Sequence, residues 1–337
     1  MKKVFWFILI VTIFQISVFT YYNRLIGQTN GVVPVSPALG GKIFSGTKEK
    51  NVTLFEGTAN CIALSANRQM VAYVDEANTL HVKDLQANNE VLNLPGEGPI
   101  SYVTWIENNG LLIGSTVDNG SGKKLTLKTV MLSSQNVRTI KEFEPDRSSY
   151  TFKKIVFSPY TNDIYILVGN KWGTQLYHVG TSGDFRSEDI SSYYIDNIEM
   201  STTKNELFFQ DVKNGIPYLH IRDDQGTRRI KKNAVLLRTV NDVLYYGTLD
   251  DSGMVSAVYK YQEGTTGTST KVTDLNTPVK PEKLLVKDDG TVITISGSSY
   301  TNLSTNQSTP LPSDGEPFIL NNSLLVNSPS KTTLINI

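Results

Sequence analysis

The three histidines of this chain are the first residues whose type could do chemistry, by binding a metal ion. His81, His178 and His220 lie in the similar contexts Leu-His-Val-Lys-Asp, Leu-Tyr-His-Val and Leu-His-Ile-Arg-Asp. A zinc site would need the imidazoles to converge and further groups to orient them. Because they recur at one position of a repeated segment, we expect them to be spread around the fold and to share no metal ion.

Three pairs of adjacent aspartates could supply oxygen ligands. They are Asp223-Asp224, Asp250-Asp251 and Asp288-Asp289, and each precedes a glycine by one to three positions. Calcium needs several oxygen ligands at close range, and no Asp-x-Asp-x-Asp-Gly loop surrounds these pairs. Tight turns favour the same residues, because aspartate bonds to its own backbone and glycine accepts positive φ. We therefore expect turns, with no metal and no cofactor.

Motifs of common enzymes are missing from the sequence. Residues 180–183, Gly-Thr-Ser-Gly, lack the spacing of the hydrolase motif Gly-x-Ser-x-Gly. Residues 120–124, Gly-Ser-Gly-Lys-Lys, lack the first glycine and the final Ser or Thr of a phosphate loop, and predict a hairpin loop. Cys61 lies on an apolar alternating segment, which is typical of a small buried side chain. We expect no catalytic residues.

The N-terminal segment predicts a membrane anchor. Lys2 and Lys3 precede an apolar run from Val4 to about Tyr22, long enough to cross a bilayer as a helix. The flanking charges place the N-terminus in the cytoplasm and the rest of the chain outside. We predict a single-pass signal anchor over residues 1–25. A cleaved signal peptide is the alternative, although bulky residues occupy the expected cleavage region.

The remaining chain reads as a short tether and one exported domain. Residues 26–41 are rich in Gly, Pro and small polar residues and predict a linker, followed by a domain over 42–337. The 32 basic side chains match 32 acidic ones, which argues against a nucleic-acid partner. The single cysteine excludes an intrachain disulfide. The abundance of Lys, Asn, Ile and Ser favours a bacterium with a single membrane as the source of the protein.

The domain repeats one plan of four short strands. Similar openings occur near residues 60, 100, 152, 195, 234, 280 and 316. Their spacing of about 43 residues is typical of propeller blades. The sequence therefore predicts an all-β propeller with seven four-stranded blades, with six as the alternative. The last segment is one strand short, and residues 50–56 could supply the missing strand and close the ring.

Two segments carry a family resemblance. Residues 64–74, followed by residues 80–85 (Leu-His-Val-Lys-Asp-Leu), resemble the repeat of TolB-like and WD40-like propellers. Residues 157–159, Phe-Ser-Pro, resemble the turn of the same repeat. The Gly-His and Trp-Asp pairs of a true WD40 repeat are missing. The resemblance implies a propeller fold and a habit of binding partners, and such folds have many unrelated functions.

One cluster of side chains is a candidate binding face. In a propeller, turns between second and third strands share a face with the links between blades. We expect that face to gather Asp118, Asn119, Tyr150, Lys171, Trp172, Tyr193 and Tyr194. Exposed aromatic anchors with polar neighbours are common at protein and carbohydrate binding sites. Alternatively, the aromatic rings cover the apolar ends of the blades.

These observations favour a non-catalytic module at the cell membrane, binding a protein, peptide or glycan of the cell envelope. The alternative is an enzyme of the lyase, lactonase or glycosidase type, with its site in the central channel. The predicted first strands offer Glu199, Lys154 and Lys283 but no histidine, which is little material for acid–base catalysis.

Overall fold

The computed structural model describes residues 51–337, apart from 119, 121, 191–193, 263–266, 314 and 321. The predicted anchor (1–25) and linker (26–41) lie outside the described residues. Within the part of the chain that is described, no helix is long and apolar enough to span a membrane.

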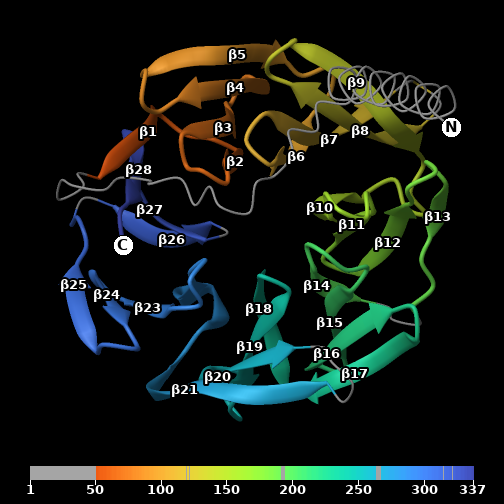
Figure 1. The fold of residues 1–337 in the computed structure, drawn as a ribbon. Coiled ribbons are helices and arrows are strands. Elements are labelled where there is room, and N and C mark those ends of the chain that lie inside the picture. The colour runs from red at the N-terminus through yellow and green to blue at the C-terminus, as the bar shows by residue number, and fades with distance from the viewer. Residues whose placement is uncertain are drawn as a thin grey trace, which may run out of the picture. The chain divides into compact units, whose positions relative to one another are not determined.

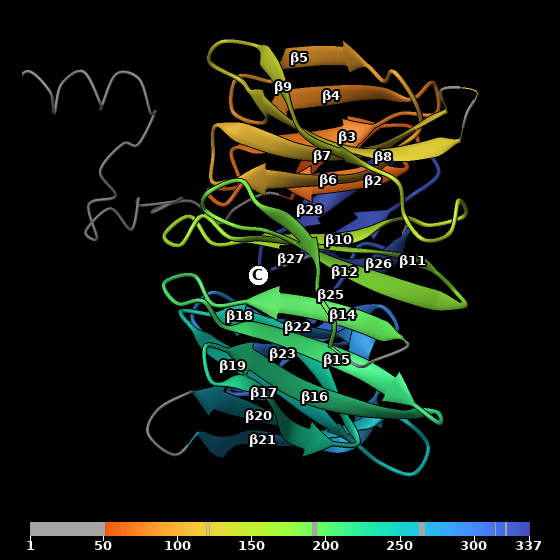
Figure 2. The ribbon, with the colours of Figure 1, turned by 90° about the vertical axis from the view of Figure 1, so that its right-hand side faces the viewer.

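The described strands form seven four-stranded antiparallel sheets, arranged as the blades of a propeller (Figure 1). This confirms the predicted fold class and decides between seven blades and six. In each blade the first strand lies nearest the central axis, and Figure 2 shows the sheets from the side.

Blades one to three contain β2 (Cys61–Leu64), β3 (Met70–Val74), β4 (Thr79–Asp84) and β5 (Asn89–Pro95); β6 (Ile100–Ile106), β7 (Gly110–Asp118), β8 (Lys123–Met131) and β9 (Asn136–Phe143); and β10 (Thr151–Phe157), β11 (Ile164–Asn170), β12 (Gly173–Val179) and β13 (Phe185–Ser187). Blades four and five contain β14 (Ile195–Met200), β15 (Leu207–Lys213), β16 (Ile216–Asp223) and β17 (Gly226–Lys232); and β18 (Ala234–Val240), β19 (Val243–Leu249), β20 (Val255–Gln262) and β21 (Thr268–Val279). Blade six follows the 3-10 helix η1 (Pro281–Lys283) with β22 (Leu284–Val286), β23 (Val292–Ser296), β24 (Ser299–Asn302) and β25 (Gln307–Pro310). Blade seven contains β26 (Glu316–Leu320), β27 (Ser323–Asn327), β28 (Lys331–Ile335) and β1 (Val52–Glu56).

The ring closes through the strand nearest the N-terminus of the described chain. β1 pairs antiparallel with β28, so it is the outermost strand of blade seven. Val52 lies opposite Leu334, and Glu56 lies opposite Lys331. The predicted closing strand is therefore confirmed.

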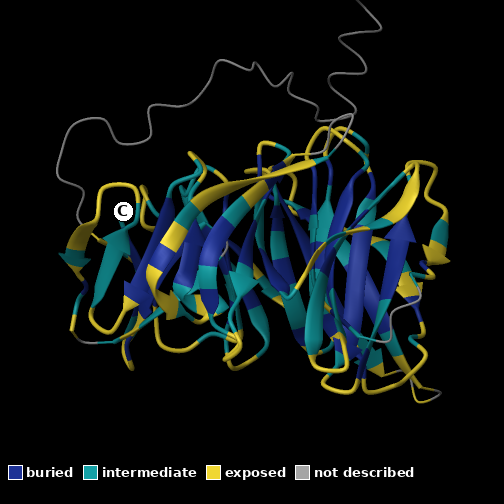
Figure 3. Cartoon of the chain, turned by 90° about the horizontal axis from the view of Figure 1, so that it is seen from below, coloured by how far each residue is buried: buried dark blue, intermediate teal, exposed yellow. Residues whose placement is uncertain are grey.

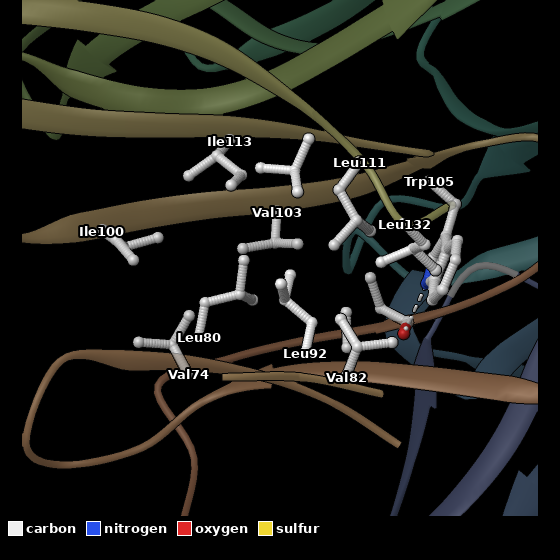
Figure 4. Packing of buried hydrophobic residues seen from close by; sticks show 13 residues of the cluster. Val74, Leu80, Val82, Leu92, Ile100, Val103, Trp105, Leu111, Ile113 and Leu132 are labelled. Carbon is white, nitrogen blue, oxygen red and sulfur yellow. Dashed lines mark hydrogen bonds between the residues drawn. The ribbon is translucent and has the colours of Figure 1, made fainter. Parts of the chain in front are cut away.

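The core consists of apolar layers between neighbouring blades. Between blades one and two, Leu80 and Val82 of β4 face Val103 of β6 and Leu111 of β7 (Figure 4). The indole Nε1 of Trp105 donates a hydrogen bond of 2.9 Å to the carbonyl of Ala63, which joins the innermost strands of these blades. Exposed residues gather in the turns and buried residues along the strands (Figure 3). Successive side chains of a strand point to opposite faces of its sheet, and both faces pack against neighbouring blades.

Three blades share one turn between their first two strands. Ser65, Ser158 and Ser201 are buried, and the backbone N–H of each bonds to the carbonyl five residues on. In Asn214-Gly215, between β15 and β16, both residues have positive φ, as a type I′ hairpin requires. Local turn chemistry therefore sets the blade register.

The third strands of the same three blades carry the histidines. In each case Nε2 bonds to one aspartate and the ring stacks on an aromatic side chain of the second strand. The pairs are His81 with Asp75 and Tyr73, His178 with Asp163 and Tyr165, and His220 with Asp211 and Phe209. The imidazoles are thus structural repeats, as the sequence predicted.

Candidate functional site

The two faces of the propeller carry different connections. We call the side with the links between blades, and with the turns between second and third strands, the connection face. The opposite side, with the turns between first and second strands and between third and fourth strands, is the turn face. The alternation of antiparallel strands fixes this assignment.

Trp172 projects from the connection face on a well-anchored turn between β11 and β12. Its side chain is 66% exposed. The Asn170 carboxamide oxygen accepts hydrogen bonds from the backbone N–H groups of Trp172 (2.8 Å) and Gly173 (3.3 Å), and Asn170 Nδ2 donates to Ser149 Oγ. These bonds hold the turn, so little backbone freedom would be lost if the indole contacted a partner.

Two lysine–aromatic pairs lie on the connection face of blade three and its link to blade four. Lys171 Nζ lies 4.8 Å from the centroid of the Trp172 ring, and Lys153 Nζ lies 4.9 Å from that of Tyr194. Lys153 Nζ also donates to the Tyr194 hydroxyl at 3.1 Å. Each cation–π pair presents apolar surface beside a positive charge. Such a surface suits a partner that offers an acidic side chain next to an apolar one.

The other predicted face residues separate into three groups. Tyr150 is 6% exposed and packs in the core between blades two and three, so its ring covers an apolar end as the alternative interpretation held. Asp118 ends β7, and its Oδ1 accepts the Gly120 N–H at 3.0 Å in the turn. Asn119 and Tyr193 lie outside the described residues. Lys171, Trp172 and Tyr194 remain as the described face residues on or beside blade three.

The central channel of the propeller is a second candidate site. A cavity of about 920 Å³ runs along the axis and is lined by the innermost strands of all seven blades. It extends from Glu282, beside β22 on the connection face, to Asp288 and Asn322 in turns of the turn face. This volume falls in the range of about 300–1,000 Å³ found for small-molecule sites.

Four successive blades carry a β-bulge in the innermost strand. The register between first and second strands shifts once in blades two, three, four and five, which leaves Ser101, Lys153, Asp196 and Leu237 unpaired. A bulge re-aims the side chains that follow it. The residues directly after the four bulges, Tyr102, Lys154, Asn197 and Arg238, all line the channel.

Lys154 is the centre of the polar cluster in the channel. Its Nζ lies 2.6 Å from Glu199 Oε1 and 2.9 Å from Asn197 Oδ1. The side chains of Lys154 and Glu199 are 24% and 20% exposed. Asn197 is held in turn, because its Oδ1 also accepts the Ile198 N–H and its Nδ2 donates to the Leu236 carbonyl. The cluster is therefore fixed in place without a ligand.

The channel wall beside this cluster is polar and aromatic. Arg238 donates to Asp288 Oδ1 (2.6 Å) and to the Val286 carbonyl (3.0 Å). Burial raises the pKa of Tyr102 to about 12, so its hydroxyl remains protonated and donates to the Ile155 carbonyl. Gln210 donates to Asp196 Oδ2 at 2.8 Å.

The sequence predicted part of this lining. Lys154 and Glu199 line the channel, whereas Lys283 belongs to η1, does not line the channel, and donates from its Nζ to the Pro317 carbonyl. Asp196 and Arg238 line the channel but were missed. The signal that could have found them is the break in alternation that the bulges cause.

The aspartate pairs form turns, as predicted. Asp223, Asp250 and Asp289 each accept a backbone N–H two residues on, at 2.9 Å. Within the described part of the chain, no group of three or more His, Cys, Asp and Glu side chains is placed to hold a metal ion.

Comparison with known proteins adds no relative: no protein-family model matches the sequence, and no curated protein matches it significantly.

Proposed function

We propose that this protein is a non-catalytic binding module of the cell envelope, held at the membrane by its N-terminal segment with the propeller outside. Its partner is a protein that docks on the connection face around Trp172. The observation that carries the proposal is the 66% exposure of this indole on a turn that Asn170 holds in place. Large exposed aromatic side chains on rigid supports are common anchors of protein interfaces.

The chemistry of the surface favours one kind of partner segment. Lys171 and Lys153 place two cations next to the rings of Trp172 and Tyr194. An acidic side chain of the partner can pair with a lysine while its apolar neighbour packs on the ring. We therefore propose a segment that carries an acidic residue beside an aromatic or aliphatic one.

We also propose that the blades are related to the repeats of TolB-like and WD40-like propellers. Its support is the turn that recurs at Ser65, Ser158 and Ser201, followed by a histidine on the third strand of the same blade. Such repeats are associated with partner binding, which agrees with the proposed role.

The enzyme alternative has less support. A lyase, lactonase or glycosidase would need a free acid–base pair in the channel. Glu199, a half-buried carboxylate of the channel, is instead ion-paired with Lys154 at 2.6 Å. Asp288 is paired with Arg238.

Crosslinking in intact cells tests the proposal. Full-length tagged protein would be crosslinked, purified and analysed by mass spectrometry, in parallel with Trp172→Ala and Tyr160→Ala. Tyr160 is a matched control because it is 60% exposed and lies in the same blade, but on the turn face between β10 and β11. We expect one envelope protein to be enriched with the wild type and Tyr160→Ala, and lost with Trp172→Ala.

Two results would contradict this proposal. Equal enrichment with a correctly folded Trp172→Ala variant would remove the connection face from the interaction. Enrichment of glycan in place of protein would show that the partner class is wrong.

The proposed membrane anchor has its own test. Protease added to cells with an intact membrane should degrade the propeller, and protection of the propeller would contradict the proposed topology.

A further inference from the structure

The central channel contains a polar cluster that the proposed docking surface does not use. Its parts come from two neighbouring blades, with Lys154 on β10 and Asn197 and Glu199 on β14. A bulge precedes the channel-facing residues in both strands. Bulges are common next to functional sites, where they aim a side chain. The same feature in four successive blades indicates a built site.

The cluster has unused hydrogen-bonding capacity of both kinds. An ammonium has three N–H donors, and Lys154 gives one to Glu199 Oε1 and one to Asn197 Oδ1. Among the described residues, neither its third donor nor Glu199 Oε2 has a bonded partner. A donor and an acceptor therefore lie side by side in the channel. Two neighbouring hydroxyl groups match them, because one accepts from the ammonium and the other donates to the carboxylate.

The charges of the cluster itself cancel, which favours a neutral ligand at this point of the channel. Glu199 balances Lys154, and Asp288 balances Arg238. An anion would meet the exposed carboxylates of the lining, Glu107, Asp196 and Glu282. A cation that reached the cluster would face the Lys154 ammonium. A charged ligand would also leave unbalanced charge in a partly desolvated site, which costs free energy.

The remaining wall suits the other faces of a small hydroxyl-rich molecule. Tyr102, Val156 and Leu237 offer ring and aliphatic surface, and Thr104 and Thr202 offer hydroxyl groups. The cavity of about 920 Å³ can enclose such a molecule. We propose that the channel binds a neutral sugar or polyol, with Lys154 donating to one ligand hydroxyl and Glu199 accepting from its neighbour. This site is separate from the Trp172 surface and does not depend on it.

Binding of defined sugars to the full-length protein in detergent tests the inference. Ligand-observed NMR and calorimetry would use D-glucose, maltose and N-acetylglucosamine, with glucosamine and glucuronate as charged counterparts. We expect at least one neutral sugar to bind at millimolar concentration or below, and its charged counterparts to bind several-fold more weakly.

Matched variants locate the site. Glu199→Gln preserves the shape of the side chain and removes the charge, and Lys154→Met preserves its length. Each should weaken binding by about tenfold or more, which corresponds to about 1.4 kcal/mol. Lys283→Met is the control, because Lys283 lies near the channel but does not line it, and Trp172→Ala separates the site from the docking surface. Both controls should bind as the wild type does.

Three outcomes of the sugar panel and the Glu199→Gln variant would overturn the inference. They are no binding of any neutral sugar in the panel, tighter binding of a charged counterpart, and wild-type affinity in a folded Glu199→Gln variant. Loss of sugar binding in Trp172→Ala alone would place the sugar on the docking surface and also overturn the channel site. If the wild type enriched no partner in cells and still bound sugar, only the proposed docking surface would be overturned.

Discussion

Arg68 of blade one donates a hydrogen bond of 3.0 Å from Nη2 to the main-chain carbonyl of Asn322 in blade seven. Asn322 Nδ2 in turn donates to Asp288 of blade six, which also accepts from Arg238 of blade five. Similar bonds join blade one to two, three to four and four to five through Asn67 and Asn108, Ser158 and Thr202, and Thr203 and Asp242. These bonds run from blade three through blades four to seven and blade one to blade two, and the Arg68 bond joins the first and the last blade of the chain.

Arg68→Met should reduce stability by removing this link while keeping most of the side-chain stem. We expect a loss of about 0.5–1.5 kcal/mol in the free energy of unfolding, the usual net value of one hydrogen bond. Urea denaturation measures it. Lys260→Met, at an exposed position, should change stability by less than about 0.5 kcal/mol. Equal effects of the two substitutions would contradict a closing role for Arg68.

Leu54→Ala tests whether β1 is an integral part of blade seven. Leu54 is fully buried and shares an apolar cluster with Leu325 of β27. We expect a loss of about 2–5 kcal/mol, as for other buried leucines, and a similar loss for Leu325→Ala. Thr53→Ala, at an exposed position of the same strand, should have little effect. A Leu54→Ala variant as stable as Thr53→Ala would show that β1 is not needed for closure.

Glu188→Ala should strongly weaken the contact between blades three and four. The Glu188 side chain is 3% exposed and pairs with Arg186 (2.7 Å) and with Arg222 of blade four (2.6 Å), beside buried His178. Removing one member of a buried ion pair costs about 3–5 kcal/mol. Thermal and chemical denaturation would measure it. Asp184→Ala removes the exposed partner of Arg186 and should cost about 1 kcal/mol or less; a comparable loss would contradict the importance of burial.

His81 should make stability depend on pH near neutrality. Burial disfavours its charged form, but the hydrogen bonds to Glu90 (2.5 Å) and Asp75 (3.1 Å) outweigh it, and the pKa is raised above the ordinary 6.5. The folded state therefore binds the proton more tightly than the unfolded state. The added stability is fully present below about pH 6.5 and is lost as the pH rises through the folded pKa.

NMR titration of the His81 ring should give a midpoint above 6.5. His81→Phe, which can keep the stacking on Tyr73, should be most destabilised relative to the wild type in mild acid. The difference should shrink toward pH 9. A difference that grows with pH would reverse the sign of the argument.

Cys61 should react slowly with alkylating reagents in the native protein. Burial raises the pKa of its thiol, which reduces the fraction of reactive thiolate at neutral pH. Because it is the single cysteine of the chain, its labelling rate reports on blade one alone. We expect labelling to accelerate at least tenfold when the protein is unfolded in urea. Equal rates in the native and unfolded protein would contradict burial of the thiol.

Much of the fold could be predicted because each blade repeats the same local chemistry. Alternating strands and turns of Ser, Asn and Gly identify each blade independently of the others. An error in one predicted blade boundary therefore does not shift the next boundary. The predicted third opening strand, 154–158, is in fact β10, Thr151–Phe157. The difference arises at Lys153, where the bulge interrupts the alternation that periodicity depends on.

Less of the candidate site could be predicted, for a related reason. Lys154 and Glu199 are recognisable as charged residues on apolar strands. Arg238 follows the bulge at Leu237, so its orientation toward the channel does not follow from simple alternation. The burial of Tyr150 depends on its packing with Phe152 and Phe143 across two blades, which spacing along one blade does not reveal.

The pairing of β1 with β28 also has a consequence for biosynthesis. β1 leaves the ribosome before every other strand described here, and its partner leaves last. During translation, the side chains of Leu54 and Phe55, which are buried in the folded protein, therefore remain unpaired while blades one to six are made. The nascent chain would expose an apolar strand for that whole interval, and such exposure invites aggregation or chaperone capture. A premature stop codon that removed only β28 would leave β1 permanently without its pairing partner.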